Sequence, residues 1–415
     1  MVSEFKPQGS AYLKKGEGRL LKAGGSWIFD NEVARVEGNI ENGGILSLLD
    51  FDGFFLGYGF YNEHSAIRIR MLSRYRKEPL NEAFFRDRVS SAWEYRKAVT
   101  DTECCRVIFG EADHLPGLVV DKYGDILVVQ SLALGIDRLK PMLMKQLKEV
   151  LAEDGIIIRG IYERSDAEVR KKEGMPLFKG VLEGDFSPRF TIVENDIRYG
   201  IDVENGQKTG FFLDQKYNRK AVGELVKRSG IRRVLDCFTN QGTFALNAAM
   251  NGADQVIGLD ISEEACVLAA RNAKENGLAE RVRFVQADVL EELPKRIEKG
   301  EKYQLVILDP PAFTKSRNAT KQAIKGYREI NMRGMKLTEN GGYLATCSCS
   351  HFMTRELLLK TVREAAKAAR KRLVLVEERA QSPDHPVLLQ HQLLGGEGEN
   401  SGYLKFFIFR VIEEV

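Results

Sequence analysis

Cysteine and histidine are scarce in this chain, which has six cysteines and five histidines among 415 residues. No C-x-x-C pair occurs and the histidines are scattered, so the ligand spacing of a structural zinc site is missing. We therefore expect no metal site, and we expect the cysteines to be reduced thiols. They are Cys104, Cys105, Cys237, Cys266, Cys347 and Cys349.

Long apolar runs are also missing. No stretch approaches the roughly 20 apolar residues that span a membrane, and the first residues, MVSEFKPQGS, lack the apolar core of a signal peptide. We therefore expect a cytoplasmic protein with no membrane partner. A chain of 415 residues is too long for one ordinary core, so we expect two or three domains.

A strong excess of one charge is missing too, since the net charge is only +3. The positive residues are nevertheless clustered, and clustered Lys and Arg suit a phosphate backbone. A solvated surface is the default interpretation of either cluster alone. The candidate RNA contacts within the clusters are Arg68, Arg70, Lys315 and Arg317, with Lys321, Lys325 and Arg328 further along.

Three regions differ in pattern. Residues 1–75 show short strands with glycine-rich turns, and AIRIRML (66–72) alternates apolar and basic residues, which predicts one buried and one positive face. Residues 76–190 show a helix (81–99), strands at 105–110, 117–123 and 125–131, a helix (137–153) and a strand (155–164). This order predicts a small α+β domain.

From residue 191 to 415, short apolar strands alternate with helices, which predicts an α/β domain with a doubly wound, Rossmann-like parallel sheet. In such sheets, ligands bind at the carboxyl ends of the strands. An aspartate falls at or next to the end of four successive strands. A single strand-end aspartate is usually a helix cap, but four would line one crevice. They are Asp236, Asp260, Asp288 and Asp309.

The turn after the first of these strands, CFTNQGTF, has Gly242 as its only glycine. A dinucleotide fingerprint needs three glycines to cradle a pyrophosphate, which argues against NAD and FAD. S-adenosylmethionine, which has no phosphate, fits better. Asp236 can meet its charged amino end, Asp260 its ribose hydroxyls and Asp288 its adenine amino group.

Three motifs together resemble the bacterial ribosomal RNA large-subunit methyltransferase I family. They are DxFxxxGxF (236–244), DPPAF (309–313) and TCSCS (346–350). The resemblance covers nearly the whole chain: LKAGGSWIFDNEV and IRIRML are similar to an N-terminal, RNA-binding PUA β barrel, and FGEADHLPGLVVDKYGD to a central domain. It implies a class I methyltransferase that forms 5-methylcytosine in 23S ribosomal RNA.

The resemblance also implies roles for residues. Phe238 and Gly242 would contact S-adenosylmethionine, and Phe211 and Gln215, in GQKTGFFLDQKYNR, would line it. One departure is Asn240-Gln241, where the family commonly has tyrosine or histidine and then threonine. Backbone contacts should survive that change.

Carbon 5 of cytosine is a weak nucleophile, so a thiolate must first add at carbon 6. YLATC (343–347) reads as a strand, which leaves Cys349 at its tip and Cys347 inside it. The family comparison agrees that Cys349 is the nucleophile, and packing is the expected role of Cys347. Asp309 would hydrogen-bond the cytosine ring nitrogen or amino group.

Other interpretations stay open at this point. DPPAF also occurs where a base nitrogen is methylated without a cysteine, so a guanine methyltransferase is an alternative. A non-catalytic RNA-binding assembly factor is another. Asp384-His385-Pro386 is equally a turn or a pocket feature. The sequence leaves the oligomeric state open, with a homodimer among the options.

Overall fold

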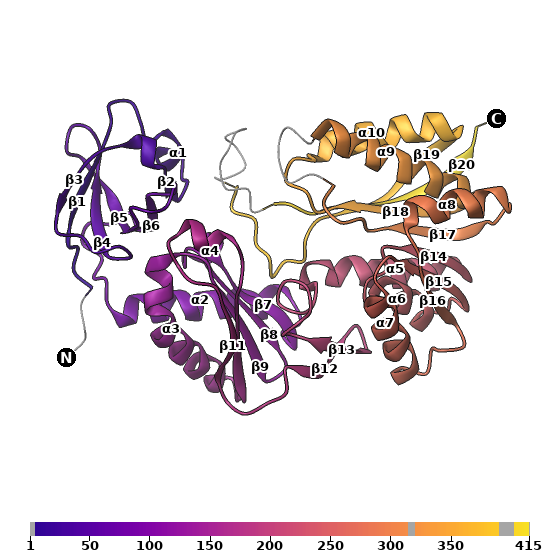
Figure 1. Cartoon of the computed structure of the whole chain (residues 1–415), viewed down its shortest axis with the longest axis horizontal. Coiled ribbons are helices and arrows are strands. Elements are labelled where there is room, and N and C mark those ends of the chain that lie inside the picture. The colour runs from indigo at the N-terminus through magenta and orange to yellow at the C-terminus, as the bar shows by residue number, and fades with distance from the viewer. Residues whose placement is uncertain (1–4, 314–319, 390–401, 415) are drawn as a thin grey trace. The chain divides into compact units, whose positions relative to one another are not determined.

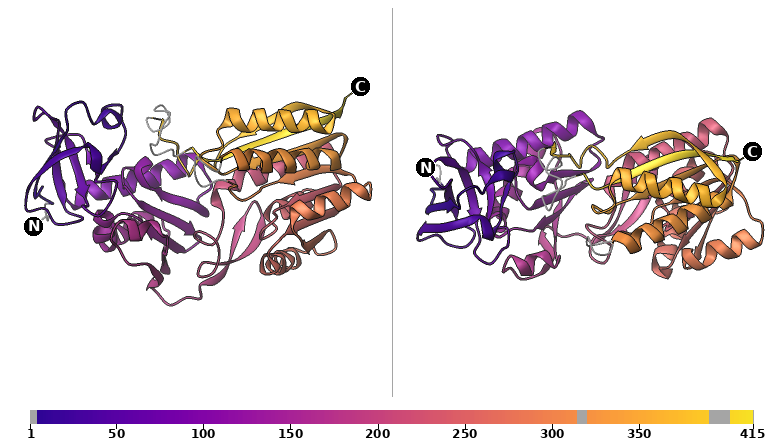
Figure 2. Two further views of the ribbon diagram at one scale, coloured as in Figure 1. Left: turned by 45° about the horizontal axis from the view of Figure 1, so that its top comes forward. Right: turned by 90° about the horizontal axis from the view of Figure 1, so that it is seen from above.

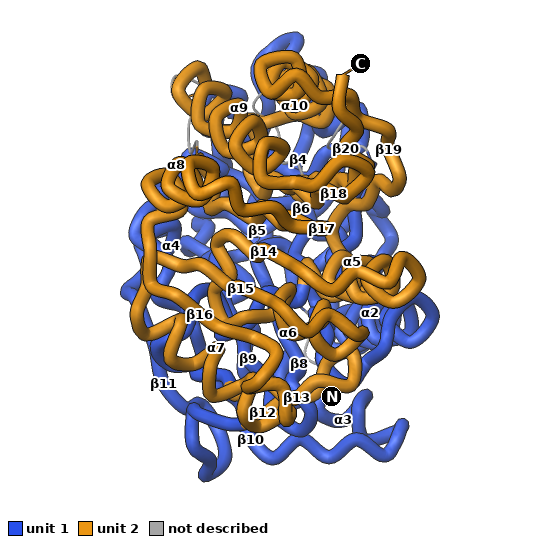
Figure 3. The backbone as a smooth tube through the Cα atoms, turned by 90° about the vertical axis from the view of Figure 1, so that its right-hand side faces the viewer, with its two compact units in different colours: residues 1–190, 201–213, 383–401 blue, residues 191–200, 214–382, 402–415 orange. Residues whose placement is uncertain are grey.

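The structure is a computed structural model that describes residues 5–313, 320–389 and 402–414. The chain divides into two compact units (Figure 3). The first comprises residues 1–190, 201–213 and 383–401, and the second comprises 191–200, 214–382 and 402–415. The chain first passes from one unit to the other, and back, within β12 (Arg189–Glu194) and β13 (Ile197–Asp202), which form a two-stranded sheet. The three-domain division inferred from the sequence stays a prediction.

Six short strands form the N-terminal sheet of the first unit, in the order β2-β6-β5-β4-β1-β3 (Figure 1). Strands β1 and β4 pair in parallel, and the other neighbours are antiparallel. The elements are β1 (Gly9–Leu13), α1 (Arg19–Lys22), β2 (Trp27–Ile28), β3 (Val33–Gly38), β4 (Ile45–Leu49), β5 (Phe55–Tyr61) and β6 (Ile69–Ser73).

Strand β6 corrects the expectation of an exposed basic face. Every residue from Ile69 to Ser73 is buried, and the Arg70 guanidinium lies 3.0 Å from a carboxylate oxygen of Glu173 and 3.3 Å from one of Glu111. The alternating pattern was misleading because residues of the following α+β part cover this face and supply two carboxylates to the arginine.

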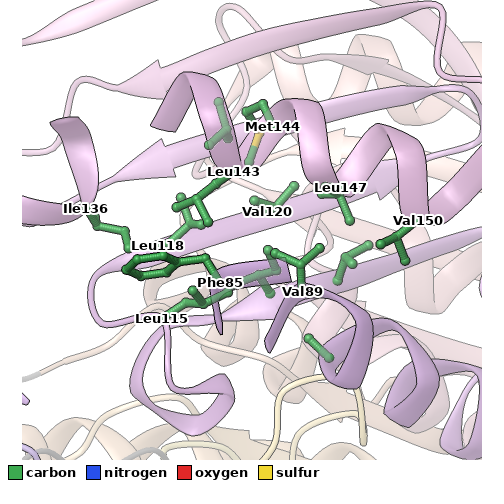
Figure 4. Close-up of a cluster of buried hydrophobic side chains, with 14 of the residues drawn as sticks. Phe85, Val89, Leu115, Leu118, Val120, Ile136, Leu143, Met144, Leu147 and Val150 are labelled. Carbon is green, nitrogen blue, oxygen red and sulfur yellow. The ribbon is translucent and has the colours of Figure 1, made fainter. Parts of the chain in front are cut away.

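The first unit also contains a five-stranded sheet in the order β11-β10-β9-β8-β7. Helices α2 and α3 pack on it, and Figure 4 shows Phe85 and Val89 of α2 meeting Leu143 and Leu147 of α3 around Val120 of β8. The elements are α2 (Glu82–Val99), β7 (Cys104–Phe109), β8 (Leu118–Tyr123), β9 (Ile126–Ser131), α3 (Leu134–Glu153), β10 (Gly160–Ser165), α4 (Val169–Lys172) and β11 (Phe178–Glu183).

Most of the predicted elements here are confirmed, but the strand expected over 155–164 begins only at Gly160. The apolar run before it is a connection, in which Ile157 is 72% exposed. A short apolar run does not by itself distinguish a strand from a connection.

The second unit has a seven-stranded sheet in the order β16-β15-β14-β17-β18-β20-β19. Strands β14 to β18 pair with one another in parallel, and β20 is antiparallel to both β18 and β19. The strands are β14 (Arg233–Cys237), β15 (Gln255–Asp260), β16 (Val282–Gln286), β17 (Tyr303–Leu308), β18 (Thr338–Ser348), β19 (Lys371–Arg379) and β20 (Lys405–Glu413). This confirms the predicted doubly wound α/β sheet.

Helices cover both faces of this sheet. Figures 1 and 3 show α8, α9 and α10 on one face and α5, α6 and α7 on the other, and Figure 2 shows α9 and α10 side by side. The helices are α5 (Lys216–Ser229), α6 (Thr243–Met250), α7 (Glu263–Glu275), α8 (Val289–Glu298), α9 (Thr320–Leu337) and α10 (Arg355–Ala369). Within the described residues, no helix has both the length and the apolar character needed to cross a membrane.

A buried ion pair joins α5 to the start of the second unit. Arg219 donates from Nε to Glu194 Oε1 (2.7 Å) and from Nη2 to Oε2 (2.9 Å), and both side chains are almost fully buried. The two parallel hydrogen bonds offset the desolvation of both charges.

We predict that Arg219→Met destabilises the second unit by about 3–5 kcal/mol, because it leaves the buried Glu194 carboxylate without its cation. Arg271→Met, which removes the cation of an exposed pair with Glu275, should cost about 0.5 kcal/mol or less. Urea unfolding measures both values, and equal losses in the two variants would contradict the assignment.

Candidate active site

The candidate site lies where the strand order reverses. From β14, the chain continues to β15 and β16 on one side and to β17 and β18 on the other, which places a ligand site at the carboxyl ends of β14 and β17. Asp236 is the last residue but one of β14, and Asp260 ends β15. Asp309 directly follows β17, and Asp288 lies two residues after β16. The parallel pairing thus brings the four predicted acids to one edge of the sheet.

Asp236 is fully buried. Its Oδ2 accepts hydrogen bonds from the Thr239 hydroxyl (2.5 Å) and from the Ala245 amide (3.0 Å). Its Oδ1 is also buried and has no hydrogen-bond partner among the described residues. Burial raises the pKa of Asp236 to about 7, and the nearby Asp309 charge adds to the rise. A buried carboxylate oxygen without a donor is costly, so it marks a place for a cationic or donor ligand.

The loop after β14 winds tightly through left-handed backbone. Phe238, Asn240 and Gly242 have φ values of 65°, 49° and 78°. A Cβ at Gly242 would lie 2.6 Å from the Phe284 ring, so glycine is also required there for space. The strained loop turns the Asn240 amide toward Asp260, whose Oδ2 it reaches at 2.8 Å.

This hydrogen bond does not depend on the unusual side chains at Asn240-Gln241, because the backbone amide makes the contact. Asparagine also tolerates left-handed φ better than most residues. Asp260 Oδ1 accepts in addition from the Ser262 amide at 3.0 Å.

Asp288 is exposed and caps α8, since its Oδ1 accepts from the Leu290 amide at 2.8 Å. Asp288 therefore has the usual role of a strand-end aspartate, that of a helix cap. Its second oxygen is left for the proposed contact with an adenine amino group.

Asp309 is the centre of a small polar cluster with Gln215 and Cys347. The Gln215 amide donates to Asp309 Oδ1 and Oδ2 at 3.2 and 3.3 Å, and the Cys347 thiol donates to Oδ1 at 2.7 Å. Burial, and the charge of Asp309, raise the pKa of the Cys347 thiol well above its ordinary value. Cys347 is buried as expected of a packed side chain, but it also contacts the carboxylate of DPPAF.

Cys349 is the first residue after the end of β18 at Ser348. It is half-buried, while the other five cysteines are buried. The adjacent Ser348 hydroxyl is hydrogen-bonded to the buried Tyr327 hydroxyl at 2.8 Å. The strand therefore ends where the sequence pattern predicted, which leaves Cys349 on the loop at the crevice edge of the sheet.

Several other predicted residues belong to the first unit. Phe211 is buried in the first unit, as are Asp384 and His385, whose segment is held by hydrogen bonds from Arg96 and Arg106 to Asp384. Arg68, the residue before β6, is half-exposed. Lys315 and Arg317 lie outside the described residues.

Comparison with known proteins shows the family of the chain. A family model of S-adenosylmethionine-dependent methyltransferases matches residues 179–390, and a PUA-like domain model matches residues 11–74. Ribosomal RNA large subunit methyltransferase I of Photobacterium profundum is 38% identical over 384 residues, which cover 91% of this chain and 95% of the relative. The enzyme of the same name from Shigella dysenteriae is 36% identical over 405 residues, 96% of this chain and 98% of the relative.

The chain belongs to the ribosomal RNA large subunit methyltransferase I family. Solved structures agree on the fold. A protein described as a SAM-dependent methyltransferase from Streptococcus mutans has a TM-score of 0.77 at 20% identity, over 97% of this chain and 99% of that one. Another, described as a methyltransferase complexed with SAH, has a TM-score of 0.79 at 20% identity over the same shares.

The family's cofactor is S-adenosylmethionine, and the residues of this chain fit it. The unused, buried oxygen of Asp236 suits a cationic amino group, and Asp260 keeps lone pairs for hydroxyl donors beside its two backbone hydrogen bonds. No group of three or more His, Cys, Asp and Glu that could hold a metal ion occurs in the part of the chain that the structure describes.

Two features escaped the sequence interpretation. The contact of Cys347 with Asp309 depends on the pairing of β17 with β18, in which Leu308 lies opposite Thr346. Lys405 lies opposite Ser348 on β20, although almost sixty residues separate it from TCSCS. A lysine opening the apolar run KFFIF was the only signal in the sequence.

We predict opposite pH effects on cofactor affinity and stability through Asp236. Its ionised form should bind the cationic amino group, so wild-type affinity falls as the pH drops below about 7. Asp236→Asn should lose about 10- to 100-fold in affinity at pH 8, roughly 1.5–3 kcal/mol, and should flatten the pH dependence. Calorimetry with S-adenosylmethionine at pH 6 and pH 8 measures this.

The effect of pH on folding stability has the opposite sign to its effect on cofactor affinity. The pKa of Asp236 is raised from 3.8 to about 7, so the folded state holds the proton more tightly and stability falls as the pH rises between these values. The difference in stability between Asp236→Asn and wild type should therefore favour the variant more at pH 8 than at pH 5. Asp254→Asn, at the opposite end of β15, is the control, and an equal pH response in both variants would argue against the buried carboxylate.

Proposed function

We propose that this chain transfers the methyl group of S-adenosylmethionine to carbon 5 of a cytosine in 23S ribosomal RNA, through a covalent adduct of Cys349. The observation that carries the proposal is the position of this half-exposed thiol, directly after β18 and two residues from a thiol that contacts Asp309. The names of the relatives support the RNA class.

The two thiols have environments suited to different tasks. Burial and the Asp309 charge raise the pKa of Cys347, which keeps it a thiol and a hydrogen-bond donor. A nucleophile must instead reach the substrate as a thiolate. Cys349 is the more accessible of the two, so it is the group that can add to a base.

Addition of the Cys349 sulfur to carbon 6 breaks the 5,6 double bond and makes carbon 5 enamine-like. S-adenosylmethionine, when bound, supplies the electrophilic methyl group. Removal of the carbon 5 proton then restores the double bond and releases the Cys349 sulfur as a thiolate.

Asp309 suits recognition of the cytosine amino group. It accepts hydrogen bonds from Gln215 and from Cys347, two neutral donors. A carboxylate accepts hydrogen bonds but does not donate them. It can therefore accept from the amino group of cytosine, whereas uracil has at the same place a carbonyl oxygen, which cannot donate. Gln215, which we expected to line the cofactor, supports Asp309 in this arrangement.

A base inside an RNA duplex cannot reach Cys349, so the target must be unpaired or flipped out, which costs a few kcal/mol. Exposed cations on α9 suit the RNA phosphates around it. Lys321, Lys325 and Arg328 are spaced four and three residues apart and share one face of the helix. Lys315, Arg317 and Arg68 remain part of the proposed RNA contact; Arg70, buried against two glutamates, does not.

We predict that Cys349→Ala abolishes 5-methylcytosine formation and leaves S-adenosylmethionine binding intact, because the adduct can no longer form. Cys347→Ala should retain activity at a reduced rate, since it removes only one donor to Asp309. Nucleoside mass mapping of ribosomal RNA from cells with each variant measures both, and RNA with 5-fluorocytidine should trap wild type but not Cys349→Ala.

Normal 5-methylcytosine with Cys349→Ala would disprove the adduct. A methylguanosine formed by Cys349→Ala would favour the base-nitrogen alternative, and failure of wild type to bind S-adenosylmethionine would favour the non-catalytic one.

We predict that replacing Lys321, Lys325 and Arg328 together with Gln weakens RNA binding and lowers the salt slope of log K by about 2–3, because each phosphate contact contributes about 0.7–0.9. The matched control replaces Lys220, Lys227 and Arg228, three exposed cations of α5 on the other face of the sheet. Filter binding at several salt concentrations measures the slope, and equal slopes in the two triple variants would exclude α9 as the contact.

A further inference from the structure

Lys405, the first residue of β20, places a partly buried ammonium group beside TCSCS. It lies opposite Ser348 in the antiparallel pairing of β18 and β20. Its Nζ donates to the carbonyl oxygens of Ser350 (2.6 Å) and Tyr403 (2.8 Å). These acceptors hold the ammonium group at the backbone of Ser350, the residue after Cys349. Because they are neutral, they do not compensate its charge.

The charge of Lys405 reaches Cys349. Burial lowers the pKa of Lys405 to about 8, while the charges of Cys349 and Glu356 oppose this fall. Lys405 in turn helps burial to lower the pKa of His351, so this histidine is neutral at neutral pH. A partly buried cation is stabilised by an anion close by, and a Cys349 thiolate would be such an anion.

Two other titratable groups of the described residues that interact with Cys349, Tyr327 and Cys347, are neutral. Burial raises the pKa of Tyr327 and of Cys347, which interact with Cys349 and stay protonated at neutral pH. Glu356, in the first turn of α10, is exposed and acts on Lys405 only at a distance. Among these neighbours, Lys405 supplies the positive charge.

We infer that Lys405 is a positioning residue that holds Cys349 as a thiolate, ready to add to the pyrimidine. The inference rests on the proposed role of Cys349 as nucleophile. The Cys349 proton passes to solvent, the electron pair of the S–H bond stays on sulfur, and Lys405 remains an ammonium ion. The step needs no oxidant or reductant.

Alkylation of Cys349 by iodoacetamide tests this without RNA or methyl transfer, because the reagent reacts with the thiolate. Digestion and mass spectrometry follow the Cys349 peptide from pH 6 to pH 10. In Lys405→Met we expect alkylation at pH 7 to be at least about tenfold slower, with the profile moved to higher pH by about one unit. Lys405→Arg, which keeps a cation and donors, should stay within about threefold of wild type.

Lys360→Met is the matched control, because it removes an exposed lysine from α10 of the same unit and should leave the profile unchanged. An unchanged profile in Lys405→Met, with S-adenosylmethionine binding intact, overturns the inference. If Lys405→Met fails to bind the cofactor, Lys405→Gln decides by the same criterion, since it keeps a donor for the carbonyl groups without a charge.

The outcome is separable from the proposed function. If Lys405→Met slows alkylation but Cys349→Ala still forms 5-methylcytosine, the thiolate is real and the covalent mechanism is wrong. If Cys349→Ala is inactive and Lys405→Met alkylates as wild type does, the mechanism stands and Lys405 has no part in activating the thiol.

Discussion

One oxygen of a buried carboxylate organises the second unit's crevice. Asp236 Oδ2 holds both the Thr239 hydroxyl and the Ala245 amide, and thereby joins the end of β14, the loop after it and the start of α6. The loop that makes these contacts passes through left-handed backbone at Phe238, Asn240 and Gly242. This arrangement has an energetic cost, because an acid is buried. The same burial keeps the second oxygen of Asp236 away from water, and a cationic ligand binds a carboxylate most strongly in such a water-free place.

The next connection passes from this loop to the neighbouring strand. The Asn240 amide binds Asp260, so the acid expected at the amino end of the cofactor and the acid expected at its ribose belong to one hydrogen-bonded structure. Because the backbone makes the contact, the unusual residues at Asn240-Gln241 are compatible with it. On the other side of the point where the strand order reverses, Gln215 and Cys347 hold Asp309 in a separate group. This group suits a different partner, the nucleobase of the proposed substrate.

Sequence patterns were sufficient for most of the fold. The alternation of apolar strands and amphipathic helices after residue 191 predicted the doubly wound sheet, and the strand-end acids predicted which edge would bind a ligand. The patterns failed where a short segment is covered by residues distant in the chain. Arg70 looked exposed until Glu111 and Glu173 were placed beside it, and the strand expected over 155–164 begins only at Gly160.

The sequence by itself determined the order of the elements, the acids at the strand ends and the cysteine at the tip of β18, because these depend on local periodicity and on residue type. Only the tertiary structure decided which groups meet. The Cys347 thiol reaches Asp309 because β18 pairs with β17, and Lys405 reaches the Cys349 loop because β20 returns antiparallel to β18. Both contacts bring together residues separated by tens of positions, and strand pairing, which sets them, is not encoded in any local stretch of the chain.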